Sequence, residues 1–285
     1  MKQETRHSLP SQRRRAVLIQ RHSVVTRLTH WLNMLCLGFL LLSGLQIFNA
    51  YPQLHWGQYG ADADPALFKI GASESDGGPH GFMKIGGVSV PTTGVLGLSK
   101  VEGEWTPRAF PAWLTLPSYQ DLAAGRRWHF FFAWTFVING LVYLGYGLLS
   151  GHFRRDLAPD RHELAPRHIW RETIDHARLR FPSGEQARNY NTLQKLTYII
   201  VIAGPLPLMV LTGLTMSPGV DAAFPVLLDI FDGRQSARTL HFITASLLVL
   251  FVIVHVAMVV LSGPWNNMRS MITGRYAVRQ EGSDA

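Results

Sequence analysis

The chain has 285 residues, of which 47% are apolar and only 16% are charged, and its formal net charge is +8. A disordered chain combines low hydrophobicity with high net charge, so this composition excludes disorder as the state of the whole chain. The single cysteine excludes a disulfide scaffold, a thiolate zinc site and a covalently attached c-type haem, which needs two cysteines.

Four segments along the chain are long enough to cross a membrane. Each contains an uncharged run of about 18 to 25 residues, and about 20 residues of helix span a hydrocarbon core. Because backbone polar groups inside a bilayer must be hydrogen-bonded within the segment, each is predicted to be a helix. The expected fold class is all-α: an integral membrane four-helix bundle with a long external loop between helices 1 and 2. The expected order is a basic N-terminal segment 1–23, span 24–48, loop 49–126, span 127–151, Arg-rich loop 152–192, span 193–217, short loop 218–235, span 236–264 and tail 265–285.

Lys and Arg are divided unequally between the two sides of this topology. Of the 27 in the chain, 19 lie in the N-terminal segment, the Arg-rich loop with its border, and the tail. The positive-inside rule then places both termini in the cytoplasm of a bacterial inner membrane, with the loop 49–126 in the periplasm.

The loop 49–126 is unusually long, and loops of this length are commonly functional or linkers. Residues 82–90 predict a hairpin across Gly86-Gly87, and residues 117–122 predict a capped short helix leading into the second span. We interpret the loop as a docking surface for a partner; the alternative is a disordered insertion.

Four histidines lie inside the spans, where ionisable residues are costly and usually functional. His241 and His255 are 14 residues apart, so they share a helix face and are separated by about 21 Å along its axis. His129 lies near the level of His241, and His30 near that of His255. Two imidazoles at each of two levels suit the axial ligands of two haem irons in a bundle core, whereas zinc prefers three or four ligands at one level.

One spacing recurs beside three of these histidines: Arg27, Arg126 and Arg238 each precede a histidine by three residues. Residues i and i+3 share a face, so each guanidinium is placed to meet a haem propionate; ordinary interfacial anchoring is the alternative. Gly44 lies 14 residues after His30 and would let a porphyrin approach, although helix packing explains it equally well. Leu41–Leu45 is echoed by Val210–Leu214.

The residues that carry this pattern resemble those of the di-haem membrane cytochrome b subunits: bacterial cytochrome b561, the nickel–iron hydrogenase b subunit and the formate dehydrogenase gamma subunit. The matching positions are Arg27–Trp31, Ser43-Gly44, His129, Asn191–Lys195, His241 and His255. They cover the four spans but neither the external loop nor most of the Arg-rich loop.

The resemblance implies two b haems in the four-helix bundle, with electrons passing between a quinone at the inner face and an external partner. It also implies that Asn191, Gln194 and Lys195 lie near the quinone, although helix capping would explain them too. Among variants, the chain is most similar to thiosulfate-reductase-type cytochrome b subunits, which serve periplasmic molybdopterin oxidoreductases.

The sequence therefore predicts an electron-transfer subunit of a respiratory chain, and leaves open whether the chain is itself an enzyme. The alternative is a self-contained quinone-linked enzyme of the cytochrome b561 type, such as a superoxide oxidase, which needs no large docking loop.

A proton-relay transporter or sensor is disfavoured because the spans hold no acidic residue. Nucleic-acid binding is not expected, since orientation and contact with anionic lipid account for the basic charge. The loop histidines His152, His162, His168 and His176 are interpreted as solvent or headgroup contacts.

Overall fold

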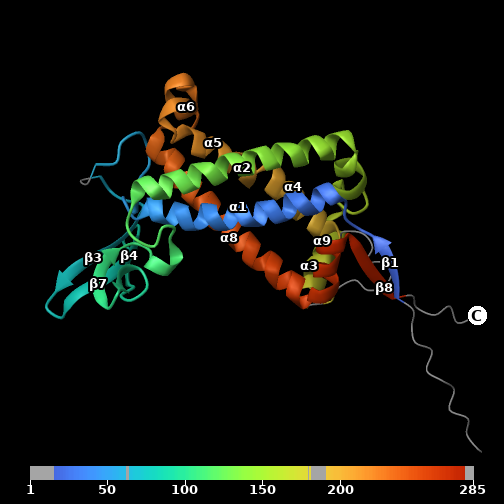
Figure 1. Ribbon diagram of the computed structural model, residues 1–285, viewed down its shortest axis with the longest axis horizontal. Coiled ribbons are helices and arrows are strands. Elements are labelled where there is room, and N and C mark those ends of the chain that lie inside the picture. Colours follow the sequence, from blue (N-terminus) through green and yellow to red (C-terminus); the bar gives the residue numbers. More distant parts are fainter. Residues whose placement is uncertain (1–15, 62–63, 179, 181–190, 280–285) are drawn as a thin grey trace, which may run out of the picture.

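The structure, a computed structural model, describes residues 16–61, 64–178, 180 and 191–279. Figure 1 shows α1 and α2 side by side along the long axis of the molecule, and α5 packs against α8. The four spans expected from the sequence are confirmed as helices. Their bounds are α1 (Val24–Phe48), α2 (Leu122–Leu149), α4 and α5 together (Thr192–Thr215), and α8 (Arg234–Leu261).

Side-chain caps explain where two of these helices begin. The Ser23 and Asp121 side chains accept hydrogen bonds from the backbone N–H groups of Thr26 and Ala124, which have no partner inside the helix. The second cap corrects one prediction. Residues 117–121 form no separate helix, because Asp121 starts α2 itself.

The third span is broken into α4 (Thr192–Ala203) and α5 (Pro205–Thr215). Proline has no backbone N–H and its ring clashes with the preceding turn, so Pro205 ends the first helix at Gly204. A single helix over 193–217 was expected, and the break is the physical consequence of this proline.

The fold is mostly helical, as the all-α prediction expects, but the prediction is incomplete because the long loop forms β-structure. A four-stranded antiparallel sheet has the order β2-β3-β4-β5, and a separate hairpin is made of β6 and β7. The predicted hairpin across Gly86-Gly87 is confirmed, since Ile85 pairs with Val88. The bounds are β2 (Gln53–Leu54), β3 (Phe68–Ser75), β4 (Gly78–Ile85), β5 (Val88–Pro91), β6 (Gly97–Val101) and β7 (Glu104–Arg108), followed by the short helix η1 (Ala112–Leu114).

This β-structure lies at one end of the helices, which we call the sheet end (Figure 1). An apolar cluster joins it to the bundle: the ring of Phe242 in α8 lies 4.9 Å from that of Phe48 in α1 and 5.4 Å from that of Phe68 in β3. Arg108 is buried beside the cluster and donates to the carbonyls of Phe110 and Ser118. Burial lowers the pKa of Arg108. The external loop is therefore packed onto the ends of α1 and α8.

Two glycines allow the β-strands to cross closely. A Cβ on Gly81 would lie 2.4 Å from the Leu96 carbonyl oxygen, and a Cβ on Gly97 would lie 2.1 Å from the Gly71 carbonyl oxygen. Gly97 also has a φ of +79°, which side chains rarely adopt. The contact between the four-stranded sheet and β6 therefore requires glycine at both positions.

The opposite end, which we call the terminal end, holds a second small sheet of β1 (Ala16–Gln20) and β8 (Arg275–Arg279) (Figure 1). Helix α9 (Pro264–Thr273) contacts the start of α1, where Arg27 donates to the Ile272 carbonyl and the Trp31 indole donates to that of Met271. The remaining elements are the single π-helical turn η2 (Phe153–Leu157) and the helices α3 (Pro166–Ala177), α6 (Pro218–Ala223) and α7 (Val226–Ile230).

Candidate functional site

The bundle brings the four predicted histidines together as two pairs. His129 of α2 faces His241 of α8 towards the sheet end, with 6.3 Å between ring centroids and 61° between ring planes. His30 of α1 faces His255 of α8 towards the terminal end, where the ring centroids are 6.2 Å apart and the ring planes meet at 61°. The pairing inferred from helix periodicity is the pairing in the structure.

The spacing within each pair fits two imidazoles on one metal ion. A metal–imidazole bond is about 2 Å, and each ring centroid lies about 1.1 Å behind its nitrogen, so collinear ligands have centroids about 6.2 Å apart. Both pairs have this separation. In the described residues, no group of three or more His, Cys, Asp or Glu is placed to hold a metal ion. The geometry therefore favours two-ligand sites of the kind that an axially ligated haem needs.

Hydroxyl groups orient both histidines of the sheet-end pair. Ser43 Oγ lies 3.1 Å from His129 Nδ1 and donates its own hydrogen to the Phe39 carbonyl. Thr212 Oγ1 lies 3.0 Å from His241 Nδ1 and donates to the Leu208 carbonyl. Because each hydroxyl hydrogen is already used, each imidazole must donate from Nδ1, which leaves Nε2 with a lone pair for a metal.

A glycine follows each of these hydroxyl residues and makes room for the same ring. A Cβ on Gly44 or on Gly213 would lie 3.4 Å from Cε1 of His129 or His241, respectively. Gly44 therefore contacts a histidine of the neighbouring helix, as Gly213 does in the other half of the bundle. The similar segments Leu41–Leu45 and Val210–Leu214 thus have the same role, since in each a hydroxyl and a glycine position a histidine of another helix. The sequence alone did not predict this role.

Replacing Ser43 with Ala is expected to weaken haem binding at the sheet-end pair about tenfold to a hundredfold, the usual cost of losing a group that orients a metal-bound histidine. The measurement is the rate of haem loss to an excess of apomyoglobin. Ser150→Ala is the matched control, since Ser150 donates to the carbonyl four residues earlier on an exposed surface. Equal rates of haem loss in the two variants would contradict the assigned role of Ser43.

The three arginines of the repeated spacing lie in different surroundings. Arg238 donates to the carbonyls of Tyr51 and Gln53, and Arg27 donates to those of Ser23 and Ile272. Arg126 is exposed, with its guanidinium 5.7 Å from the Phe130 ring centroid. A guanidinium has five N–H donors, so Arg27 and Arg238 keep donors for a propionate, and that role stays a prediction for all three.

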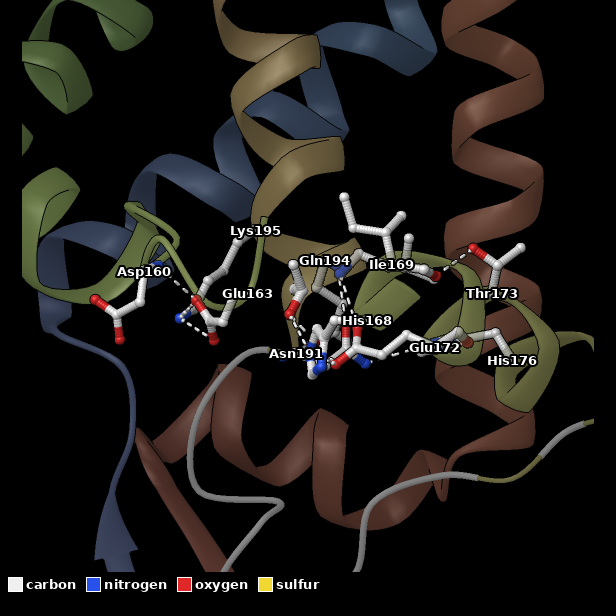
Figure 2. A network of polar contacts seen from close by, with 12 residues as sticks. Asp160, Glu163, His168, Ile169, Glu172, Thr173, His176, Asn191, Gln194 and Lys195 are labelled. Carbon is white, nitrogen blue, oxygen red and sulfur yellow. Dashed lines mark hydrogen bonds and ion pairs between the residues drawn. The ribbon is translucent and has the colours of Figure 1, made fainter. Parts of the chain in front are cut away.

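The polar residues at the start of α4 belong to a network with α3 (Figure 2). Asn191 and Gln194 form a capping box, and the amide of Asn191 lies 3.0 Å from His176 Nε2. Lys195 Nζ lies 2.9 Å from both carboxylate oxygens of Glu163. Burial would raise the pKa of Glu163, but the hydrogen bond from Lys195 outweighs it and the pKa is lowered. The capping role is thus observed, and the quinone role of these residues stays a prediction.

Three loop histidines have protein partners, so their interpretation as solvent or headgroup contacts is wrong. His168 lies 3.1 Å from the Thr192 hydroxyl, and His176 contacts Asn191, both within the network of Figure 2. His152 is buried and lies 2.6 Å from Asp156. Their partners lie outside the spans, where helix periodicity gives no guidance.

The fold and the two histidine pairs define a class: multi-pass helical membrane proteins that carry paired imidazoles at membrane depth. The prokaryotic cytochrome b561 family model matches residues 21–274, and the chain belongs to this family. It is therefore a membrane protein that binds b-type haem.

A similar protein from Azospira oryzae is named as the protein-methionine-sulfoxide reductase subunit YedZ1. It is 35% identical to this chain over 155 residues, which are 54% of this chain and 73% of the relative. No solved structure matches the chain.

Proposed function

We propose that this chain is a di-haem cytochrome b that transfers electrons across a bacterial inner membrane, between a quinone pool and a periplasmic redox partner. The observation that carries the proposal is the pair of two-imidazole sites at opposite ends of one bundle. Each has the ring separation that fits one metal ion. The 14-residue interval between His241 and His255 corresponds to about 21 Å along the axis of α8.

Within this proposal, His129 and His241 hold one haem, and His30 and His255 hold the other. Haem supplies one-electron oxidation and reduction, and the protein tunes it through the axial ligands and their hydrogen bonds. Ser43 and Thr212 fix the imidazole orientation at the sheet end. Arg27, Arg126 and Arg238 are the proposed propionate contacts.

The sheet end is the proposed docking surface for the partner. It projects beyond the helices (Figure 1), and it packs onto Phe242, the residue that follows His241 in α8. The Azospira relative is named as a subunit of a reductase, which supports a subunit role here as well. The partner class that we propose is a periplasmic oxidoreductase of the molybdopterin type.

The proposed quinone site lies at the terminal end, beside His30 and His255, with Asn191, Gln194 and Lys195 as its polar contacts. The ammonium of Lys195 is held by Glu163 in the structure, so a quinone carbonyl would compete with this carboxylate for the same donor. The positive-inside rule gives the orientation, with the terminal end in the cytoplasm.

Gentle purification from the native membrane tests the proposal. We expect two haems per chain and, by mass spectrometry, a co-purifying periplasmic redox subunit. A protein without haem would overturn the proposal. A two-haem protein that is reproducibly alone and oxidises or reduces quinone unaided would instead identify a self-contained enzyme, such as a superoxide oxidase.

A further inference from the structure

The chain that leaves α2 folds back to place a histidine against the helix end. Gly151 has a φ of +69°, in the left-handed region that favours glycine, and η2 follows at once. The Phe153 ring packs so closely on Gly147 that a Cβ there would lie 2.4 Å from it. Single π-helical turns are frequent at functional sites. This turn fixes the position of His152.

His152 is only 8% exposed and lies between an acid and a phenol. Its Nδ1 is 2.6 Å from Asp156 Oδ2, and its Nε2 is 3.5 Å from the Tyr143 hydroxyl. Burial would raise the pKa of Asp156, but hydrogen bonds from Arg155 and His152 outweigh it and the pKa is lowered. The carboxylate is therefore charged at neutral pH and accepts the hydrogen of His152 Nδ1.

A polar cavity of about 310 Å³ adjoins this pair, and His22, Tyr146 and Arg155 are among its walls. The Arg155 side chain is 69% exposed, so solvent reaches this wall of the cavity. Burial and the charge of Arg21 lower the pKa of His22 to about 4, with smaller contributions from His30 and His152. His22 thus lies close enough to both the haem-ligand candidate and His152 to sense their charge.

We propose that His152 is the proton-exchange residue of the terminal end, passing protons between water in this cavity and the Tyr143 hydroxyl. The inference rests on the proposed quinone function: one quinone takes up two electrons and two protons to become a quinol. Protonated His152 gives a proton to the Tyr143 oxygen as Tyr143 passes its own hydroxyl proton on towards the reduced quinone, which accepts it, and neutral His152 then takes the next proton from cavity water. Quinol oxidation runs the same transfers in reverse.

Asp156 is a positioning residue in this scheme, because it orients the imidazole. The titratable and charged groups around His152 come from four elements: Tyr143 and Tyr146 from α2, Arg155 and Asp156 from η2, Arg21 and His22 from the segment before α1, and Tyr198 from α4 near Tyr143.

The kinetic test uses the purified two-haem protein, reduced beforehand, and follows haem reoxidation by decylubiquinone from pH 5.5 to 8.5. We expect His152→Gln to slow reoxidation about a hundredfold, as loss of a general acid does, and to flatten its pH dependence. His162→Gln is the matched control, since His162 lies exposed on the same side of the bundle. An unchanged rate and pH profile in His152→Gln would overturn the inference, while the wild-type reaction with decylubiquinone would still support the proposed function.

A second measurement is independent of turnover. In protein with ¹⁵N-labelled histidine, NMR reports the environment of each ring nitrogen of His152. We expect Asp156→Asn to move the His152 Nδ1 resonance, because the short hydrogen bond to a charged carboxylate is lost. Identical His152 Nδ1 resonances in wild type and Asp156→Asn would overturn the pairing. Wild-type haems that decylubiquinone cannot reoxidise would overturn the proposed quinone function and this inference with it.

Discussion

Replacing His129 or His241 with Ala is expected to reduce the haem content from two per chain to one. In the proposed site each imidazole supplies one of two axial ligands, so either replacement leaves that site with a single protein ligand. The pyridine haemochrome assay on purified protein measures the ratio, and the spectrum of the remaining haem identifies the terminal-end site.

The reciprocal variants sharpen this result. His30→Ala and His255→Ala are expected to remove the other haem and leave the sheet-end spectrum in place. His162→Ala is the control for losing a histidine outside both pairs, and it should keep two haems. If His129→Ala and His241→Ala both retained two haems, the assignment of axial ligands would be wrong.

Gly81→Val is expected to slow electron exchange with the proposed periplasmic partner at least tenfold, while both proposed haems remain bound. The added side chain would meet the Leu96 carbonyl oxygen at 2.4 Å, so the four-stranded sheet and β6 could not keep their present contact. The proposed haem ligands lie on α1, α2 and α8, and α1 packs on α2 and α8 on α5 through contacts between the helices themselves. We expect at least a tenfold loss of partner-dependent haem reduction or oxidation, because orientation of the two centres is lost.

Gly77→Ala provides the matched comparison for Gly81→Val. It lies between β3 and β4, and a Cβ there meets no atom within 4 Å, so partner exchange should stay at the wild-type rate. Haem content and thermal stability measured alongside separate a local change from general misfolding. Wild-type exchange in a Gly81→Val protein with a disrupted sheet would show that the partner docks elsewhere.

The helices and the histidine levels could be predicted because they depend on local, periodic physics. A membrane span shows itself by the length of its uncharged run, and two histidines 14 residues apart must share a face of one helix. The pairing of His30 with His255 then followed from chain direction alone. The structure brings the four histidines together in these two pairs, and their role as ligands stays a prediction.

What could not be predicted depends on contacts between distant segments. Strand β1 pairs with β8, which lies more than 250 residues later in the sequence, and the local sequence of either segment does not predict this pairing. The buried position of His152 depends on a π-helical turn and on the contact with Asp156. Neither feature leaves a periodic pattern of hydrophobic residues in the sequence. The similarity between the segments around Ser43 and Thr212 is visible in the sequence. Its role is not, because it depends on the contact of each hydroxyl with an imidazole of a neighbouring helix.

The axial interval between the two histidine levels has an electrical consequence. About 21 Å is roughly two-thirds of the thickness of a hydrocarbon core. Within the proposed function, an electron moving from one level to the other therefore crosses at most about two-thirds of the transmembrane voltage, worth about 1.5 kcal/mol at 100 mV, or about a tenfold change in the equilibrium between the levels. Electron flow in one direction charges the membrane, and flow in the other direction is driven by the charge already stored across it.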